Sequence, residues 1–435
     1  MPRAGRRRVR FGWTRVGSRR TLIIHRVSPV GGAPVLPLQG HHRRRGRDGS
    51  VVHVVVIAHT RHPISQPFAG GLESLTWHLV HGLVDRGHRV SVFAARGTEP
   101  IPGVEHLWPE ELELSPAARQ DVSMPEEGSM QRHHAYLRLM LSLAARRDVD
   151  IVNNHSLHYL PTAMAPTLPI PTVLTLHTPP TPWLESALAS ARGLPGPPVH
   201  ASAVSRHTAR AWAHLLPAQV VANGVDTGTW RPGPGGERLV WSGRIVPEKA
   251  PHLAARIARA AGLPLVLAGP VSDEAYFREV LEPLCGPEVE YAGHLRAPDL
   301  AELVGQSAAA LVTPAWDEPY GLVAAEALAC GTPVLALARG GLPEVVGPDV
   351  GRLVPVPDGA GTEDEVVARG AALLPQVLAL SRQDCRSYAV AHHSLDRMVD
   401  DYVRLYEHIA EAGPARPGGR PMGRKVRRVP AWGVA

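Results

Sequence analysis

The chain has 435 residues, of which 44% are hydrophobic and 20% charged, proportions typical of a globular protein with two or three domains. Its net charge of +6 is unevenly distributed. Residues 1–50 hold thirteen Arg and one Asp, residues 414–435 hold five Arg and one Lys, and the segment between them holds 27 basic and 39 acidic residues. The excess of positive charge therefore lies in the two tails. Since the middle of the chain is acidic, the net charge gives no reason to expect that this part binds nucleic acid.

The cysteines and the apolar runs bear on the cellular compartment. Cys285, Cys330 and Cys385 lie far apart without Cys-x-x-Cys or Cys/His spacing, which argues against disulfides and against a structural zinc site. The apolar run at residues 51–58 is far shorter than the roughly 20 residues that a membrane helix needs. We therefore expect a cytoplasmic protein without a membrane span.

Both tails are rich in Arg, Gly and Pro and show no helical periodicity. The first tail has no apolar segment of the kind that a secretory signal carries. We expect residues 1–50 and 414–435 to be disordered extensions. The alternative is a basic patch that contacts anionic lipid or nucleic acid, and contact with lipid would place the protein at the inner face of the membrane.

From residue 51 the sequence alternates between apolar strand-like runs and helical stretches. The first run, VVHVVVIA (51–58), is followed by a helical stretch at about 72–86. Further runs are HRVSVFAA (88–95), DIVNNH (150–155), PTVLTLH (171–177), HASAVS (200–205) and AQVVANGV (218–225). These runs are continuously apolar rather than alternating, which is typical of parallel strands that helices cover on both faces.

The segment DTGTWRPGPGGERL (226–239) interrupts this series with four Gly and two Pro, and it predicts a linker. A helix is then predicted for PHLAARIARAAG (251–262), which begins with Pro and ends with Gly. The strands of this second half are LVWSGRI (239–245), LPLVLAG (263–269), VEYAGHL (289–295), AALVTPA (309–315) and TPVLALA (332–338). The last predicted helix, 395–413, has one broad apolar face.

The order of elements predicts two doubly wound α/β domains with parallel sheets, which face each other across a cleft. Ligands of such sheets bind at the carboxyl ends of the strands. The expected boundaries are a basic extension (1–50), a first Rossmann-like domain (51–225), a linker (226–236), a second Rossmann-like domain (237–394), a helix that packs back on the first domain (395–413) and a basic tail (414–435).

The segment DEPYGLVAAE (317–326) places Glu318 and Glu326 eight positions apart around a predicted helix start. Pro is favoured at the first helical position, so we expect the helix to begin near Pro319, with Gly321 in its first turn. A helix start offers free N–H groups to phosphate, and eight residues span about 12 Å, roughly the reach from a hexose past a diphosphate to a ribose. The alternative is that Glu326 caps a buried donor and that Glu318 is a solvated loop residue.

Two cations follow the first strand of the second domain, in SGRIVPEKA (242–250). At the carboxyl end of that strand, Arg244 offers a planar fork and Lys249 a point charge to the same diphosphate. The alternative is a surface ion pair of Lys249 with Glu248.

Two further features belong to the first domain. Gly70–Gly71 stands directly before a predicted helix, where it forms either a second anion-facing turn or a plain connection. His177 ends a predicted strand and is followed by Thr178 and two prolines. It either faces the cleft or is a half-buried structural histidine.

Taken together, these residues resemble the family 4 glycosyltransferases, which are retaining enzymes of the GT-B fold. The similarity covers about residues 51–413. The matching segments are FAGGLESLTWHLVHGLVDRGHRVSVFA (68–94), ANGVD (222–226), SGRIVPEK (242–249), EPYGLVAAE (318–326) and ACGTPVLALARGGLPEVV (329–346).

The resemblance implies a role for each candidate residue. His177 and Glu318 would be the catalytic residues beside the transferring sugar, and Gly70–Gly71 would lie near the phosphates or the acceptor. The donor-binding residues would be Arg244 and Lys249 at the diphosphate, Gly321 and Leu322 at the helix start, and Glu326 at the ribose. Two positions depart from the family pattern: Ala250 stands where many relatives have Gly, and Thr178 where many have Asp.

The implied reaction is transfer of a hexose from a UDP- or GDP-sugar to an acceptor hydroxyl, with retention at the anomeric carbon. No Asp-x-Asp metal clamp follows any of the predicted cleft strands and no cofactor motif is evident, so we expect the transfer to need neither a metal nor a cofactor. The alternatives are an epimerase or phosphorylase of the same shape, an NAD enzyme, and an inactive nucleotide-sugar-binding protein. The identities of the donor and of the acceptor stay open.

Overall fold

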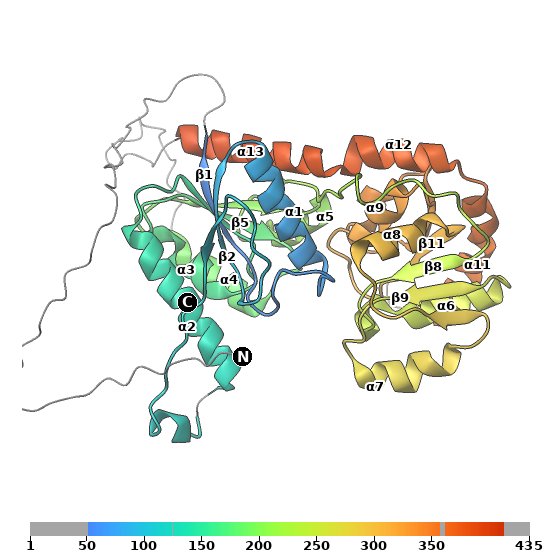
Figure 1. The fold of residues 1–435 in the computed structure, drawn as a ribbon, viewed down its shortest axis with the longest axis horizontal. Coiled ribbons are helices and arrows are strands. Elements are labelled where there is room, and N and C mark those ends of the chain that lie inside the picture. The colour runs from blue at the N-terminus through green and yellow to red at the C-terminus, as the bar shows by residue number, and fades with distance from the viewer. Residues whose placement is uncertain (1–50, 124, 357–361, 413–435) are drawn as a thin grey trace, which may run out of the picture. The chain divides into compact units, whose positions relative to one another are not determined.

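The computed structural model describes residues 51–123, 125–356 and 362–412 (Figure 1), and the expectations for the two tails lie outside these residues. Its strands form two sheets within one compact unit of the chain. The strands of the first sheet are β1 His53–Ile57, β2 Arg89–Phe93, β3 Glu105–Leu107, β4 Ile151–Asn154, β5 Thr172–Leu176, β6 Val199–Ala203 and β7 Gln219–Val220. Those of the second are β8 Leu239–Ser242, β9 Leu265–Ala268, β10 Val289–Tyr291, β11 Ala309–Val312, β12 Val334–Leu337 and β13 Gly351–Val354.

Helices connect these strands and cover the sheets. Those of the first half are α1 Gly71–Asp85, α2 Glu127–Ala145, α3 Tyr159–Met164, α4 Pro182–Ala191 and α5 Arg206–Trp212. Those of the second half are α6 Pro251–Ala260, α7 Glu274–Tyr276, α8 Ala297–Gly305, α9 Leu322–Ala329, α10 Leu342–Val345, α11 Glu363–Leu378, α12 Arg382–His393 and α13 Leu395–Ala412. Single turns of 3-10 or π helix complete the set, at Ala118–Gln120, Ala165–Thr167, Pro247–Lys249, Phe277–Leu281 and Glu282–Leu284.

Both sheets are parallel and doubly wound, as the sequence predicts. The first has seven strands in the order β3-β2-β1-β4-β5-β6-β7, and the second has six in the order β10-β9-β8-β11-β12-β13. The strand order reverses beside β1 in one sheet and beside β8 in the other, where β1 pairs with β2 and β4 and β8 pairs with β9 and β11. Such reversals open a crevice at the carboxyl ends of the strands, where doubly wound sheets bind their ligands.

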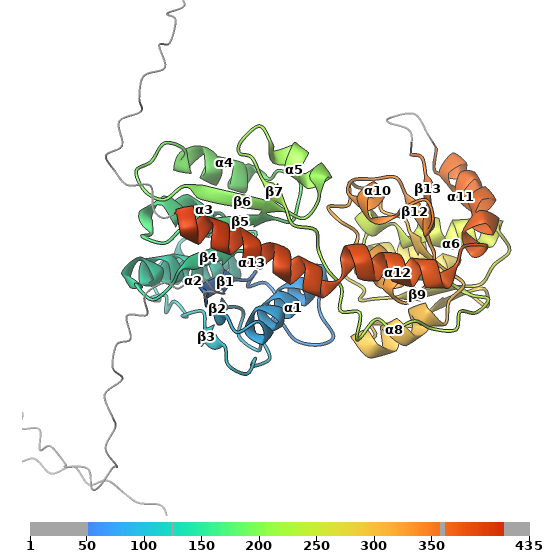
Figure 2. The ribbon, with the colours of Figure 1, turned by 90° about the horizontal axis from the view of Figure 1, so that it is seen from above.

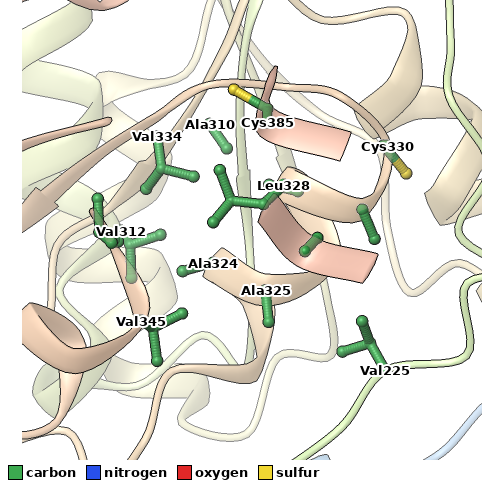
Figure 3. Packing of buried hydrophobic residues seen from close by; sticks show 14 of the residues in the cluster. Val225, Ala310, Val312, Ala324, Ala325, Leu328, Cys330, Val334, Val345 and Cys385 are labelled. Carbon is green, nitrogen blue, oxygen red and sulfur yellow. The ribbon is translucent and has the colours of Figure 1, made fainter. Parts of the chain in front are cut away.

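The strand cores are fully buried, which explains their continuously apolar sequences. Val54, Val55, Val56 and Ile57 of β1 are each 0% exposed, because helices cover both faces of the sheet. In the second sheet the small residues of α9 pack against β11 and β12, and Figure 3 shows Ala324 and Leu328 among these apolar side chains.

The last helix, α13, returns from the second sheet to the first, where it lies beside α1 (Figure 2). Its apolar face belongs to the same buried cluster as β1 and α1. The contact with α1 is close, since a Cβ on Gly82 would lie 2.5 Å from Cγ2 of Val399.

Three details differ from the sequence prediction. The strand expected at 218–225 contains only the two residues of β7, and the short strands β3 and β13 were not anticipated. The helix expected to begin near Pro319 begins at Leu322, because the preceding residues form hydrogen bonds to neighbouring loops, as described below.

Among the described residues, none of the helices combines the length and the apolarity needed to cross a membrane.

Candidate functional site

A cavity of about 470 Å³ lies between the carboxyl ends of the two sheets. All the candidate residues of the sequence analysis line it: Gly70, Gly71, His177, Arg244, Lys249, Glu318, Gly321, Leu322 and Glu326. They come from loops after β1, β5, β8 and β11 and from the start of α9. The structure therefore brings together side chains that are up to 256 positions apart in the chain.

The segment before α9 is held in place from both halves of the protein. The hydroxyl of Ser205 donates a hydrogen bond of 2.6 Å to the carbonyl of Pro319, and that of Tyr320 donates one of 2.6 Å to the carbonyl of Asn223. The amide of Gly341 donates one of 2.6 Å to the carbonyl of Glu318. Since the carbonyls of Glu318 and Pro319 accept bonds from Gly341 and Ser205, they do not begin a helical ladder, and α9 starts three residues later than the proline predicts.

Gly321 is the residue that turns the chain into α9. Its φ of 102° lies in the left-handed region that favours glycine, and a Cβ there would lie 2.4 Å from Cδ2 of Leu342. Glu326 consequently stands about one turn into α9, closer to the helix start than the sequence predicts. The free N–H groups of the first turn and the Glu326 carboxylate therefore lie near each other along one wall of the cavity.

Lys249 and Glu318 form an ion pair at the wall of the cavity. The Lys249 ammonium hydrogen-bonds the Glu318 carboxylate, which also accepts a bond of 3.3 Å from the indole N–H of Trp316. The ammonium lies 5.4 Å from the centre of the Trp316 ring, a distance typical of a cation–π contact. The Glu318 side chain is only 14% exposed, so it is not the solvated loop residue of the alternative interpretation.

Arg244 follows β8 and lies 3.4 Å from Glu248. Glu248, expected as an alternative partner for Lys249, therefore pairs with the other cation.

Ala250 follows Lys249 with a φ of 45°, a left-handed conformation that glycine adopts without strain. This backbone geometry gives a physical reason for the glycine that many relatives carry at this position.

Glu326 is half-buried at the cavity wall, and its carboxylate accepts no hydrogen bond from any of the described residues. Burial raises the pKa of Glu326 to about 7. Without a buried donor to cap, this carboxylate carries a desolvation cost that the protein itself does not offset, as expected of a group that binds a ligand.

His177, at the end of β5, is half-buried and lines the cavity. Its Nε2 lies 3.0 Å from Nδ1 of His155, which follows β4. Burial lowers the pKa of His177 to about 3 and that of His155 well below its ordinary value, so both imidazoles are neutral at pH 7. The sequence left the partner of His177 open, because Thr178 stands where many relatives have Asp, and the structure places His155 in that position.

Gly70 and Gly71 have a packing reason as well as a predicted role at phosphate. A Cβ on Gly71 would lie 2.9 Å from Cδ1 of Leu322. Gly71 and Leu322 are the first residues of α1 and α9, so the N-terminal ends of these two helices lie close together. A Cβ on Gly70 would lie 3.3 Å from Oε2 of Glu73, which is buried beside the same helix start. Burial raises the pKa of Glu73, and the group nearest to Gly70 at the start of α1 is thus itself a carboxyl group.

Sequence reasoning missed Glu73, His155 and Trp316 among the residues of this region. His155 directly follows β4, and His177 directly follows the neighbouring parallel strand β5. Because the carboxyl ends of neighbouring parallel strands lie at the same edge of the sheet, this position in the sequence could have indicated that the two histidines meet. Nothing in the spacing of Glu73 or Trp316 distinguishes them from ordinary first-turn or loop residues.

Comparisons with known proteins give the same assignment for both halves. A model of glycosyltransferase family 4 matches residues 69–229, and a model of glycosyl transferases group 1 matches residues 231–366. Together these models span more than half of the chain.

Among named relatives, the chain is 32% identical over 236 residues to the D-inositol 3-phosphate glycosyltransferase of Mycolicibacterium smegmatis, covering 47% of this chain and 51% of that protein. It is 34% identical over 223 residues to the enzyme of that name from Mycobacterium avium, covering 46% and 52%. The chain thus spans about half the length of the curated relatives it matches.

Solved structures share the fold at low sequence identity. The glycosyltransferase AviGT4 of avilamycin A biosynthesis has a TM-score of 0.60 at 24% identity, covering 83% of this chain and 99% of its own. The sucrose-phosphate synthase of Thermosynechococcus elongatus has a TM-score of 0.63 at 18% identity, covering 83% and 100%. Anabaena HepE, solved with UDP and glucose, has a TM-score of 0.61 at 16% identity, covering 82% and 100%.

The order and direction of the strands in both sheets, the matched family models and these structural neighbours agree with one another. The chain belongs to the family 4-like glycosyltransferases and has a GT-B fold.

Proposed function

We propose that the protein transfers a hexose from a nucleoside-diphosphate sugar to an acceptor hydroxyl with retention at the anomeric carbon. The observation that carries the proposal is the convergence on one cavity of Arg244, Lys249, the start of α9 and the carboxylate of Glu326, which has no donor among the described residues. Two cations and a helix start suit a diphosphate, and a carboxylate without a protein donor suits the hydroxyls of a ribose.

UDP is the nucleotide that we favour for the donor. Anabaena HepE, which shares the fold, has been solved with UDP-glucose and with UDP. For the acceptor, the matched relatives are named for inositol 3-phosphate, so polyol phosphates are the first acceptors to examine.

In the proposed reaction the diphosphate is the leaving group. Arg244, Lys249 and the N–H groups of α9 stabilise the charge that develops on it, as positioned cations and dipoles do in phosphoryl chemistry. The leaving phosphate oxygen takes the proton of the acceptor hydroxyl on the same face of the sugar. Glu318, which Lys249 and Trp316 hold, then accepts hydrogen bonds from sugar hydroxyls, and His177 orients the sugar.

We propose that this transfer needs neither a metal nor a cofactor, since protein side chains supply the positive charge. We also place it in the cytoplasm, where Cys285, Cys330 and Cys385 would stay free, as they are in the structure. Activity that survives chelation with EDTA is the expected result, and its loss with recovery on adding Mg²⁺ or Mn²⁺ would contradict the metal-free proposal.

The test is a transfer assay with UDP- and GDP-hexoses and a panel of acceptors that includes inositol phosphates. We expect acceptor-dependent release of the nucleotide, and an anomeric configuration in the product, read by NMR coupling, that matches the donor. Lys249→Ala and Glu326→Ala should each lower the rate by about 100-fold while the fold is retained. Wild-type rates in both variants would contradict the assignment of Lys249 and Glu326 to the donor site. Donor binding without turnover for every acceptor would instead favour an inactive binding protein.

A further inference from the structure

A line of hydrogen bonds connects the last helix of the chain with the cleft histidine. The amide nitrogen of Asn153, in β4, donates to the hydroxyl of Tyr406 on α13 and lies 2.7 Å from Nε2 of His155. Nδ1 of His155 in turn lies 3.0 Å from Nε2 of His177. Asn153 and His155 are 0% exposed and Tyr406 is 1% exposed, so water does not compete for these bonds.

The orientation of the Asn153 amide sets the direction of every bond in this line. Its oxygen accepts a hydrogen bond of 3.0 Å from the hydroxyl of Thr175, so its nitrogen faces Tyr406 and His155. An amide nitrogen only donates, so Nε2 of His155 must accept, and in a neutral imidazole the proton then sits on Nδ1.

The same logic extends one residue further, to His177. Nδ1–H of His155 donates to Nε2 of His177, which therefore carries the lone pair, and the proton of His177 sits on its Nδ1. Within the described residues this Nδ1 has no hydrogen-bond partner and is not among the buried atoms that lack one, so it is open to the cavity that His177 lines.

We propose that Tyr406, Asn153 and His155 are positioning residues that hold His177 in a single tautomer, as an N–H donor at Nδ1 directed to an oxygen of the bound sugar. This inference rests on the proposed function for the identity of the ligand. Fixing a tautomer through the second ring nitrogen is the general way in which proteins orient histidines, and a preorganised donor avoids reorganisation when the ligand arrives.

The inference gives α13 a part in the site of the first sheet. The helix follows the second sheet in sequence, yet its Tyr406 hydroxyl forms the far end of the line. Tyr402, one turn earlier, offers a matched control. Its ring centre lies 5.8 Å from that of His155, but its hydroxyl faces Thr175 and Ser202 and, among the described residues, forms no hydrogen bond to Asn153, His155 or His177.

The direct test is the tautomer of His177, read from the ¹⁵N chemical shifts of histidine-labelled full-length protein, with His177→Gln used to assign the signal. We expect Nδ1 of His177 to be protonated in the wild type and in Tyr402→Phe. His155→Phe, which removes the donor, should leave a mixture of tautomers. A wild-type His177 protonated at Nε2 overturns the proposal, and this readout does not depend on any transfer activity.

Kinetics supply the second test. We expect His155→Phe to lower kcat about tenfold or more with little change in the donor KM, and His155→Asn, which keeps an N–H donor near the Nδ1 position, to recover part of the loss. Tyr406→Phe should lower kcat severalfold, whereas Tyr402→Phe should leave it unchanged. Equal losses in the two tyrosine variants, or an unchanged kcat in His155→Phe, would overturn the proposal. If the wild type shows no transfer at all, the proposed function fails and the NMR result alone decides this inference.

Discussion

Glu326 has an unusual position for a carboxylate, because it is half-buried at the cavity wall without a donor among the described residues. Burial raises its pKa from 4.5 to about 7, so between these pH values the folded protein binds more protons than the unfolded chain. The contribution of Glu326 to the free energy of unfolding therefore falls as pH rises from about 4.5 to 7, and it stays constant above pH 7.

This loss of stability with rising pH leads to a prediction for Glu326→Gln. The variant lacks the cost of ionising a buried carboxyl, so it should be more stable than the wild type at pH 8 by up to about 3 kcal/mol and similar to it at pH 4.5. Thermal unfolding across this pH range measures the difference. An advantage that does not grow with pH would show that the carboxylate is solvated.

Donor binding should have the opposite pH dependence at the same residue. Ribose hydroxyls donate to the ionised carboxylate, so the affinity for the nucleotide should rise as pH increases through about 7 in the wild type. Glu326→Gln should bind more weakly at pH 8, and its affinity should vary less with pH. Calorimetric titration of UDP at several pH values checks this, and identical pH profiles in both proteins would contradict a ribose contact.

The Lys249–Glu318 pair leads to a third prediction at the residue scale. Because the lysine already bonds to Glu318, the bound diphosphate must share or replace that contact, so Glu318→Gln should not abolish nucleotide binding. Lys249→Ala, in contrast, should weaken UDP binding at least tenfold. Arg238→Ala is the control, since Arg238 pairs with Glu290 at the surface and does not line the cavity. Retained UDP affinity in Lys249→Ala would remove this lysine from the site.

At the residue scale the sequence revealed which side chains gather at the cleft but not how they pair. Residue type and position after a strand were enough to select Lys249, Glu318 and His177. The bonds of Lys249 to Glu318 and of His155 to His177 join residues from different loops, and their geometry depends on the packing of both sheets.

Among the elements, α9 is the one whose start defines the site. Gly321 combines a φ of 102° with close contact to Leu342, so both backbone strain and steric overlap oppose a side chain there. Gly321→Ala should therefore lower the free energy of unfolding by about 2–4 kcal/mol and weaken nucleotide binding.

Gly262→Ala provides the matched control for Gly321→Ala. Gly262 also has a positive φ, 68°, but a Cβ there would meet nothing within 4 Å. It should cost about 1 kcal/mol of stability and leave nucleotide affinity unchanged. Denaturant unfolding and nucleotide titration of both variants measure the effects, and equal losses in both would show that the contact with Leu342 is unimportant.

The strand and helix pattern was largely predictable, for physical reasons. Long apolar runs such as that of β1 are buried on both faces and leave a clear signature in the sequence. β3 is only three residues long and partly exposed, so its sequence carries little such signal. The start of α9 was predicted from Pro319 alone, and hydrogen bonds from Ser205 and Gly341 override that local preference.

On the scale of the whole molecule, Glu344 connects the two halves. It belongs to α10, and its carboxylate accepts hydrogen bonds from the amides of Arg206 and His207 at the start of α5, at 2.9 and 2.7 Å. An acidic side chain there satisfies free N–H groups and complements the helix dipole.

We predict that Glu344→Ala lowers the stability of the protein by about 1–3 kcal/mol, because two amides lose their acceptor. Calorimetry should show a lower first transition, and transitions of the two halves that lie further apart. Glu365→Ala is the control, since Glu365 is exposed on α11 and its single ion pair within the described part of the chain is with Arg369. An unchanged transition in Glu344→Ala would mean that Ser205, which also caps α5, is sufficient.

The central claim is that the cavity between the sheets holds a nucleoside diphosphate, with its ribose at Glu326. The most direct measurement is calorimetric titration of UDP and of 2′,3′-dideoxy-UDP into the wild type and into Glu326→Ala. The wild type should bind UDP at least tenfold more tightly than the dideoxy compound, and Glu326→Ala should bind the two alike, at the weaker affinity. A Glu326→Ala variant that still prefers UDP by the wild-type factor would contradict the claim.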